Sequence, residues 1–105
     1  MTVPLTVAFT ARATKETRQA IAWWRENRPA APYLLEQELR NVLALVASAP
    51  TLGAVARDAR VKGVRRVLMR RTRYHLYYRI NAGGTLLEVV ALWHANRRDP
   101  PLQNT

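Results

Sequence analysis

The sequence predicts an α+β fold in which a hairpin of two helices packs on one face of a small antiparallel sheet. Apolar residues alternate near the N-terminus, recur at helical spacing over two middle segments, and alternate again over three later segments. The expected order is therefore β-α-α-β-β-β. A chain of 105 residues suffices for one modest core, so residues 1–105 are expected to form a single domain.

The first strand and helix follow from a change of period. Residues 2–9 alternate as in a strand, and Pro4 favours a sheet edge because proline cannot donate a hydrogen bond to a neighbouring strand. From residue 12 to 27 the apolar spacing is helical. The expected core positions of this helix are Ala13, Thr17, Ala20, Ile21 and Trp24.

Prolines separate the two helices. Pro29 ends the first helix, because a residue before proline is disfavoured in helical geometry. Pro32 is expected in the first turn of a second helix, which Pro50 and Gly53 close. The short link implies that the helices are antiparallel. The second helix has its expected core positions at Leu35, Leu39, Val42, Leu43 and Val46.

The second half of the chain is expected to supply a surface loop and three strands. Residues 51–63 form the loop, and the strands cover 64–70, 73–80 and 85–93. Side chains alternate between the two faces of a strand. One face of the middle strand would carry Tyr74, Leu76, Tyr78 and Ile80, and the other Arg73, His75, Tyr77 and Arg79.

Positive charge dominates the composition and is unevenly distributed. The chain has 17 Lys and Arg against 7 Asp and Glu, a formal net charge of +10. Six basic and four acidic residues lie in 1–56, and eleven basic and three acidic residues in 57–105, giving +2 and +8. Such a field attracts nucleic acid or an acidic protein. Binding surfaces are therefore expected mainly in the second half.

Several classes of protein are disfavoured. There is no cysteine, which excludes disulfides and thiolate metal sites and is compatible with the cytoplasm. No apolar run reaches the roughly 18 residues of a membrane span, and the N-terminus lacks a secretory signal. Two histidines 19 positions apart, with no carboxylate companions, predict no metal site. No phosphate-loop or dinucleotide motif occurs, and no cofactor is expected.

Sequence motifs spread over nearly the whole chain carry a family resemblance. They are Pro-Ala-Ala at 29–31, Ala-Pro-Thr-Leu-Gly at 49–53, Gly-Val-Arg-Arg-Val at 63–67, Tyr-His-Leu-Tyr-Tyr-Arg-Ile at 74–80, and Leu-Trp-His-Ala-Asn-Arg-Arg-Asp-Pro at 92–100. In this order and spacing the chain resembles the RelE/ParE toxins of type II toxin–antitoxin systems. The resemblance implies growth inhibition, a role in plasmid stabilisation and neutralisation by a cognate acidic antitoxin. It also implies contact with operator DNA only through that antitoxin.

Within this family the chain resembles the ParE branch more than the RelE branch. The last strand runs into a His and two Arg before Asp99, and the tail after Trp93 contains no tyrosine. RelE-type ribonucleases usually carry a tyrosine there. The resemblance therefore implies a non-enzymatic toxin whose target is DNA gyrase.

The alternative is a ribosome-dependent mRNA endoribonuclease. Arg65, Arg73 and Arg79 would hold the phosphate, and His94 (or His75) would transfer the proton. A structural interpretation of His94 is that its ring bonds a backbone carbonyl and completes the sheet. The family's usual arginine in the middle strand is His75 here, which weakens a phosphate-binding role at that position. A third class is a nucleic-acid-binding module without toxicity.

The residues expected to bind the target or the antitoxin are mostly basic. Trp23 is added to the basic residues because it lies beside Trp24 and cannot share a narrow buried stripe with it. Leu34 and Leu45 also lie off the main apolar stripe of their helix. Together with Trp23 they form either an uncovered apolar strip or part of a wider buried face. The full set is Lys62, Arg65, Arg66, Arg70, Arg73, His75, Tyr77, Arg97, Arg98 and Trp23.

Overall fold

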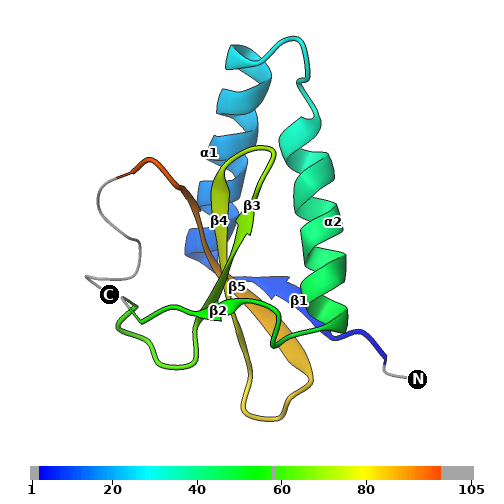
Figure 1. Ribbon diagram of the computed structural model, residues 1–105, viewed down its shortest axis with the longest axis vertical. Coiled ribbons are helices and arrows are strands. Elements are labelled where there is room, and N and C mark those ends of the chain that lie inside the picture. The colour runs from blue at the N-terminus through cyan, green and yellow to red at the C-terminus, as the bar shows by residue number, and fades with distance from the viewer. Residues whose placement is uncertain (1–2, 58, 98–105) are drawn as a thin grey trace.

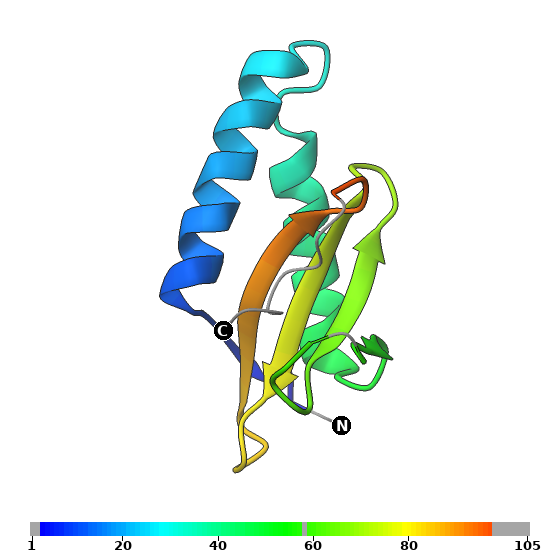
Figure 2. The same ribbon diagram turned by 90° about the vertical axis from the view of Figure 1, so that its left-hand side faces the viewer.

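The computed structural model describes residues 3–57 and 59–97. Its elements in order are β1 (Thr6–Phe9), α1 (Ala11–Asn27), α2 (Leu34–Ser48), β2 (Ala54–Val55), β3 (Arg65–Met69), β4 (Tyr74–Ile80) and β5 (Leu86–His94). The two helices stand side by side (Figure 1). Turned by 90°, the molecule shows them covering one face of the sheet (Figure 2). The expected α+β fold with a helical hairpin on one face is confirmed.

The sheet differs from the expectation in two respects. Its strand order is β1-β5-β4-β3-β2, and β1 runs parallel to β5 while the other pairs are antiparallel. The sheet is therefore mixed rather than antiparallel, because the helical hairpin carries the chain back before β5 pairs with β1. The expected loop at 51–63 also contains strand β2, whose Ala54 and Val55 pair with Arg66 and Arg65. The edge position expected for the first strand is confirmed.

The helices begin where side chains and turns fix their first residues. Thr10 caps α1, since its hydroxyl accepts a hydrogen bond from the backbone N–H of Ala13 at 3.1 Å. Helix α2 begins at Leu34, so the expectation that Pro32 lies in its first turn is wrong. The carbonyl of Ala31 accepts bonds from the Leu34 N–H and from the indole of Trp24. These two bonds fix a turn, which places Pro32 ahead of the helix.

The main core lies between the helices and the sheet. Ile21, Val42 and Leu43 are partly buried against this core, as is Leu34, whereas Trp23 is 45% exposed. Of the three residues expected either in an uncovered strip or in a wider buried face, Trp23 and Leu45 are exposed and Leu34 is not. The buried members of this core are Ala13, Ala20, Trp24, Leu35, Leu39, Val46, Met69, Tyr74, Leu76, Tyr78, Leu87, Val89 and Leu92.

A second, smaller core occupies the opposite face of the sheet. Its buried residues are Ala56, Val64, Tyr77, Val90 and Ala91, with Ala59, Val61 and Trp93 packed against them. The segment after β2 therefore folds back over this face of β4 and β5. A register shift between Tyr77 and Tyr78 marks a β-bulge in the pairing of β4 with β5.

Glu38 joins α2 to the tip of the β3–β4 hairpin. This buried carboxylate accepts hydrogen bonds from the backbone N–H groups of Arg71 and Thr72 at 2.8 and 2.9 Å, and from the Thr72 hydroxyl at 2.6 Å. Three donors satisfy the charged group, which offsets much of the cost of removing it from water. The contact holds the hairpin at a fixed distance from the helices.

Tyr78 makes the corresponding contact at the start of β2. Its hydroxyl accepts a bond from the Gly53 N–H at 2.9 Å and donates one to the Pro50 carbonyl at 2.7 Å. A β-carbon at residue 53 would lie only 2.6 Å from the Tyr78 oxygen, so glycine is required there. Burial raises the pKa of Tyr78 above its ordinary value, and the phenol stays protonated.

We expect Tyr78→Phe to lower the free energy of unfolding by about 1–3 kcal/mol, because it leaves a buried N–H and a carbonyl without partners. Denaturant unfolding measures the change. Tyr33→Phe is the matched control, since Tyr33 is exposed and should alter stability much less. Equal effects of the two substitutions would contradict the role assigned to the Tyr78 hydroxyl.

Candidate functional site

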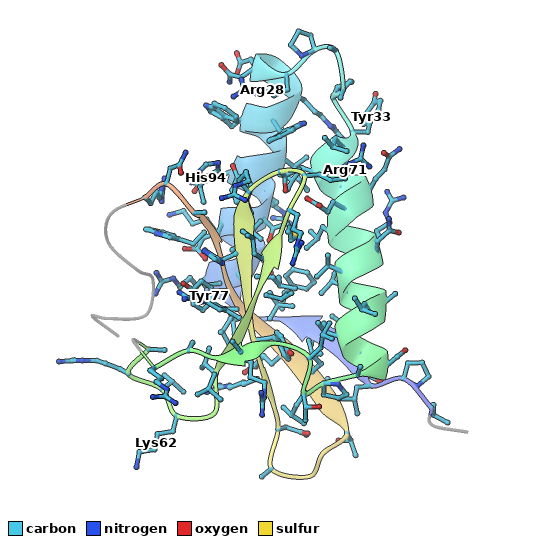
Figure 3. The ribbon with its side chains drawn as sticks, viewed as in Figure 1. Arg28, Tyr33, Lys62, Arg71, Tyr77 and His94 are labelled. Atoms are coloured by element: carbon cyan, nitrogen blue, oxygen red, sulfur yellow. The ribbon has the colours of Figure 1, made fainter. Side chains whose placement is uncertain are left out.

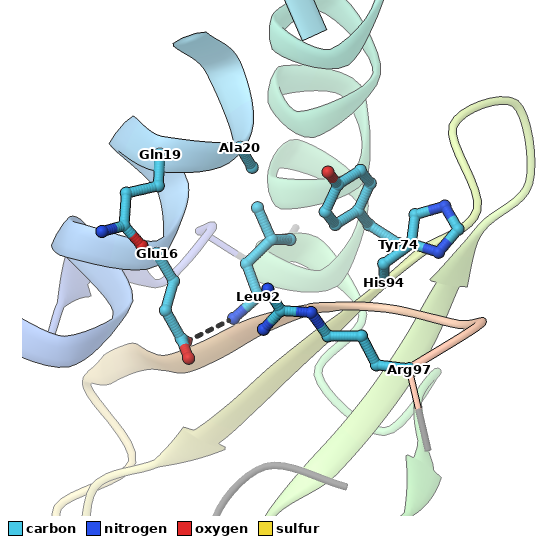
Figure 4. A pocket seen from close by; sticks show the side chains of 7 residues that line it. All are labelled: Glu16, Gln19, Ala20, Tyr74, Leu92, His94 and Arg97. Atoms are coloured by element: carbon cyan, nitrogen blue, oxygen red, sulfur yellow. Dashed lines mark hydrogen bonds between the residues drawn. The ribbon is translucent and has the colours of Figure 1, made fainter. Parts of the chain in front are cut away.

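A groove lies where α1 passes the free side of β5. Strand β1 pairs with β5 only from Leu86 to Val89. Beyond that point α1 borders β5, and the Leu92 N–H donates a hydrogen bond to the Glu16 carboxylate at 3.1 Å (Figure 4). The shortness of β1 thus leaves the end of β5 facing a helix instead of another strand.

The groove is lined by polar, aromatic and basic side chains. Its wider part has a volume of about 480 Å³. Glu16, Ala20 and Leu92 extend it into a narrower hollow, where Tyr74 and His94 lie together on one side (Figure 4). The wider part is lined by Gln19, Trp23, Arg28, Tyr74, His94, Asn96 and Arg97.

His94 lines both the wider and the narrower part of this groove. Its ring meets the Tyr74 ring edge to face, with centroids 4.9 Å apart, and its Nδ1 accepts a hydrogen bond from the Asn96 N–H at 3.1 Å. The expected bond to a backbone carbonyl is therefore replaced by one from a backbone amide. In the neutral ring this arrangement assigns the proton to Nε2.

Burial and neighbouring positive charge keep His94 neutral. Partial burial is the largest cause that lowers its pKa below the ordinary 6.5, and the guanidinium groups of Arg73, Arg97 and Arg28 lower it further. An imidazole with a lowered pKa carries little charge at pH 7. The His94 ring would accept a proton more readily once a bound anion offset the positive charges of these arginines.

Arg73 adopts a backbone geometry that usually belongs to glycine. Its φ is +67°, and its carbonyl accepts a hydrogen bond from the Ala95 N–H at 2.8 Å. A non-glycine residue in this region costs on the order of 1 kcal/mol. The expectation that Arg73 lies on a strand face with His75 is therefore wrong, because Arg73 belongs to the turn that precedes β4.

The two arginines that line the groove lie against indole rings. The Arg28 guanidinium is 4.9 Å from the ring centroid of Trp23 and 5.8 Å from that of Trp24. The Arg97 guanidinium lies 4.3 Å from the Trp93 ring. Such cation–π contacts hold a positive charge in place without neutralising it.

Other expected site residues lie away from this groove. Lys62 and Arg79 line a separate hollow with Glu88, and the Arg79 guanidinium forms an ion pair with Glu88 at 2.7 Å. Figure 3 shows Lys62 near the lower end of the molecule and His94 well above it. Arg70 is exposed in the β3–β4 hairpin.

The two faces of the sheet separate the remaining candidates. Arg65 pairs with Tyr78, and its guanidinium donates to the Gly53 carbonyl at 2.7 Å. Arg66, the next residue of β3, pairs with Tyr77, and both side chains point to the opposite face of the sheet from those of Arg65 and Tyr78. Tyr77 is only 2% exposed, so its ring belongs to the second core and cannot stack on a base. The four residues expected on one face of the middle strand, Arg73, His75, Tyr77 and Arg79, therefore do not form one basic and aromatic surface.

The His75 ring lies 6.2 Å from that of Tyr77, on the face away from His94. Arg98 lies outside the described residues.

Among the residues that the structure describes, no group of three His, Cys, Asp or Glu side chains is arranged to hold a metal ion. None of the described helices combines the length and apolar character needed to cross a bilayer.

A family comparison identifies the chain. A model described as the ParE toxin of the type II toxin–antitoxin system parDE matches residues 7–99. The match covers every helix and all but the first residue of the sheet. The chain belongs to the ParE toxin family. A comparison with curated protein sequences found no match.

Solved structures agree with the fold of a ParE-family toxin. A chain of the chromosomal ParDE system of Pseudomonas aeruginosa superposes with a TM-score of 0.69 at 15% identity, covering 88% of this chain and 97% of that one. A chain of the RelBE2 toxin–antitoxin complex of Mycobacterium tuberculosis gives 0.61 at 24%, covering 88% and 99%. The isolated RelE toxin of Escherichia coli gives 0.58 at 21%, covering 90% and 88%. The RelE/ParE-like fold is confirmed.

Sequence reasoning placed Trp23, Arg73, His94 and Arg97 among the candidates but missed Arg28. A signal was present, because Arg28 follows Trp24 by four residues, the spacing at which helical side chains meet. No sequence pattern indicates that Glu16 meets β5, since 76 residues separate it from Leu92.

In this ParE-family toxin we expect Arg73→Gln to raise the pKa of His94 toward 6.5, because Arg73 is the positive charge that lowers this pKa most after burial. NMR titration of the imidazole measures the shift. Arg40→Gln, at an exposed position of α2, removes the same charge elsewhere and should have a smaller effect. An unchanged His94 pKa in Arg73→Gln would contradict the electrostatic account.

Proposed function

We propose that this chain arrests growth by binding and inhibiting DNA gyrase. The ParE family match over residues 7–99 is the observation that carries the proposal. The tail sequence after Trp93 supports it, because it contains no tyrosine of the kind that RelE-type ribonucleases usually carry. Inhibition by binding needs a complementary surface rather than a catalytic set.

The arrangement of basic side chains favours binding over RNA cleavage. A ribonuclease would need its phosphate-binding arginines and its proton-transferring histidine around one scissile bond. Here Arg79 is paired with Glu88, and Arg65 donates to the Gly53 carbonyl. His94 lies with Tyr74 in the groove beside α1. The gyrase proposal requires no such convergence.

We propose further that a cognate acidic antitoxin neutralises the toxin in the cytoplasm. Relatives of the same fold were solved as toxin–antitoxin complexes, including RelBE2 of Mycobacterium tuberculosis. A net charge of +10 favours an acidic partner. Contact with operator DNA would then occur only through the antitoxin, and the chain would act as one domain over residues 1–105.

The test is DNA supercoiling by purified gyrase, with increasing amounts of the toxin. We expect supercoiling to fall and cleaved DNA to accumulate on the enzyme. Incubation of the same toxin with mRNA and ribosomes is the parallel reaction. Cleavage of that mRNA, lost in His94→Ala, together with unaffected supercoiling, would overturn the proposal in favour of an endoribonuclease.

A further inference from the structure

The groove beside α1 holds a concentration of positive charge. Within residues 3–57 and 59–97, the ion pairs are Arg12–Glu16, Arg25–Glu36 and Arg79–Glu88. None of these involves Arg28, Arg73 or Arg97, the three cations that act on His94. Among the described residues, therefore, no carboxylate pairs with these three arginines, and their charges can attract an incoming anion.

The aromatic rings of the groove offer few open faces, and among Trp23, Tyr74 and His94 the most accessible is Trp23, which is 45% exposed. The Arg28 guanidinium covers one face of the Trp23 ring. The Tyr74 and His94 rings pack against each other edge to face. Tyr74 is only 8% exposed. Binding of single-stranded nucleic acid depends on open ring faces on which bases stack. The groove thus fits small anionic groups on a flexible chain better than it fits nucleobases.

We propose that the groove between α1 and the end of β5 binds the carboxylate side chains of an acidic peptide segment of the antitoxin. The inference rests on the proposed neutralisation by an acidic antitoxin and adds the place and chemistry of the contact. Arg28 and Arg97 donate hydrogen bonds to the carboxylates, because a guanidinium presents a fork of N–H donors that matches a carboxylate. Trp23 packs against the apolar parts of the same segment.

Glu16 is the carboxylate among the lining residues of the groove, and it should repel a bound carboxylate only weakly. Glu16 lines only the narrower hollow. One of its oxygens accepts from the Leu92 N–H, and the other pairs with the Arg12 guanidinium at 3.2 Å. Its charge is therefore largely offset, and the wider part of the groove stays positive.

Binding of a carboxylate should draw a proton onto His94. The groups that face this ring are Arg28 at the end of α1, Arg73 in the turn before β4, Tyr74 at the start of β4, and Arg97 after β5. A bound carboxylate would offset the three cations and raise the pKa of His94. Affinity therefore increases as the pH falls through the higher pKa of the complex, and levels off below the lower pKa of the free protein.

The experiment uses the full chain and an acetylated, amidated tetraglutamate peptide as the probe, with binding measured by calorimetry at low salt. We expect Arg28→Gln and Arg97→Gln each to weaken binding about fivefold or more, equivalent to about 1 kcal/mol. Arg40→Gln, which makes the same change in net charge on α2, should weaken it less than about twofold. His94→Gln should remove the increase in affinity between pH 7.5 and 5.5. Thermal unfolding of each variant checks that the fold is kept.

Equal losses in Arg28→Gln, Arg97→Gln and Arg40→Gln would overturn the inference, because attraction would then depend on net charge alone. The inference would also be overturned if the groove variants weakened binding of oligothymidylate but not of tetraglutamate, since the site would then be for nucleic acid. Gyrase inhibition is measured without any peptide. Failure of the groove assignment can therefore be distinguished from failure of the proposed toxin activity.

Discussion

The packing of alternate β4 side chains against the helical hairpin is the constraint on which the rest of the structure depends. Tyr74, Leu76 and Tyr78 are buried on the helix side of the sheet. Because the side-chain period of a strand is two, this choice also decides the face of every neighbour in register. It places His94 beside Tyr74 and directs His75 to the other face. The two histidines therefore cannot serve one site.

The length of β1 is the second determinant of the site. Had the parallel pairing of β1 continued, a strand would lie along the end of β5. The chain instead turns into α1 at Ala11, and Glu16 of that helix satisfies the Leu92 N–H. The end of α1 then brings Trp23 and Arg28 beside the end of β5. A short strand and a partly buried hydrogen bond thus produce a basic groove from segments far apart in the sequence.

Much of this arrangement could be predicted from the sequence, since periodicity determines both helices, the three long strands and the buried face of β4. The parallel pairing of β1 could not, because apolar alternation does not encode strand order. Alternation places Tyr77 on the face opposite the helices, where the segment after β2 folds over it and forms a second core. Arg79 was a candidate for phosphate binding, and its cross-strand partner Glu88 neutralises it. Tertiary contacts, which no local pattern contains, explain each of these differences.

We propose that this ParE-family toxin acts by binding a protein surface and performs no RNA chemistry. The amount of gyrase covalently attached to chromosomal DNA, measured in cells after expression of the chain is induced, tests that claim most directly. We predict a rise in gyrase–DNA adducts that precedes growth arrest and is prevented when the antitoxin is co-expressed. Growth arrest without any rise in adducts would contradict the account.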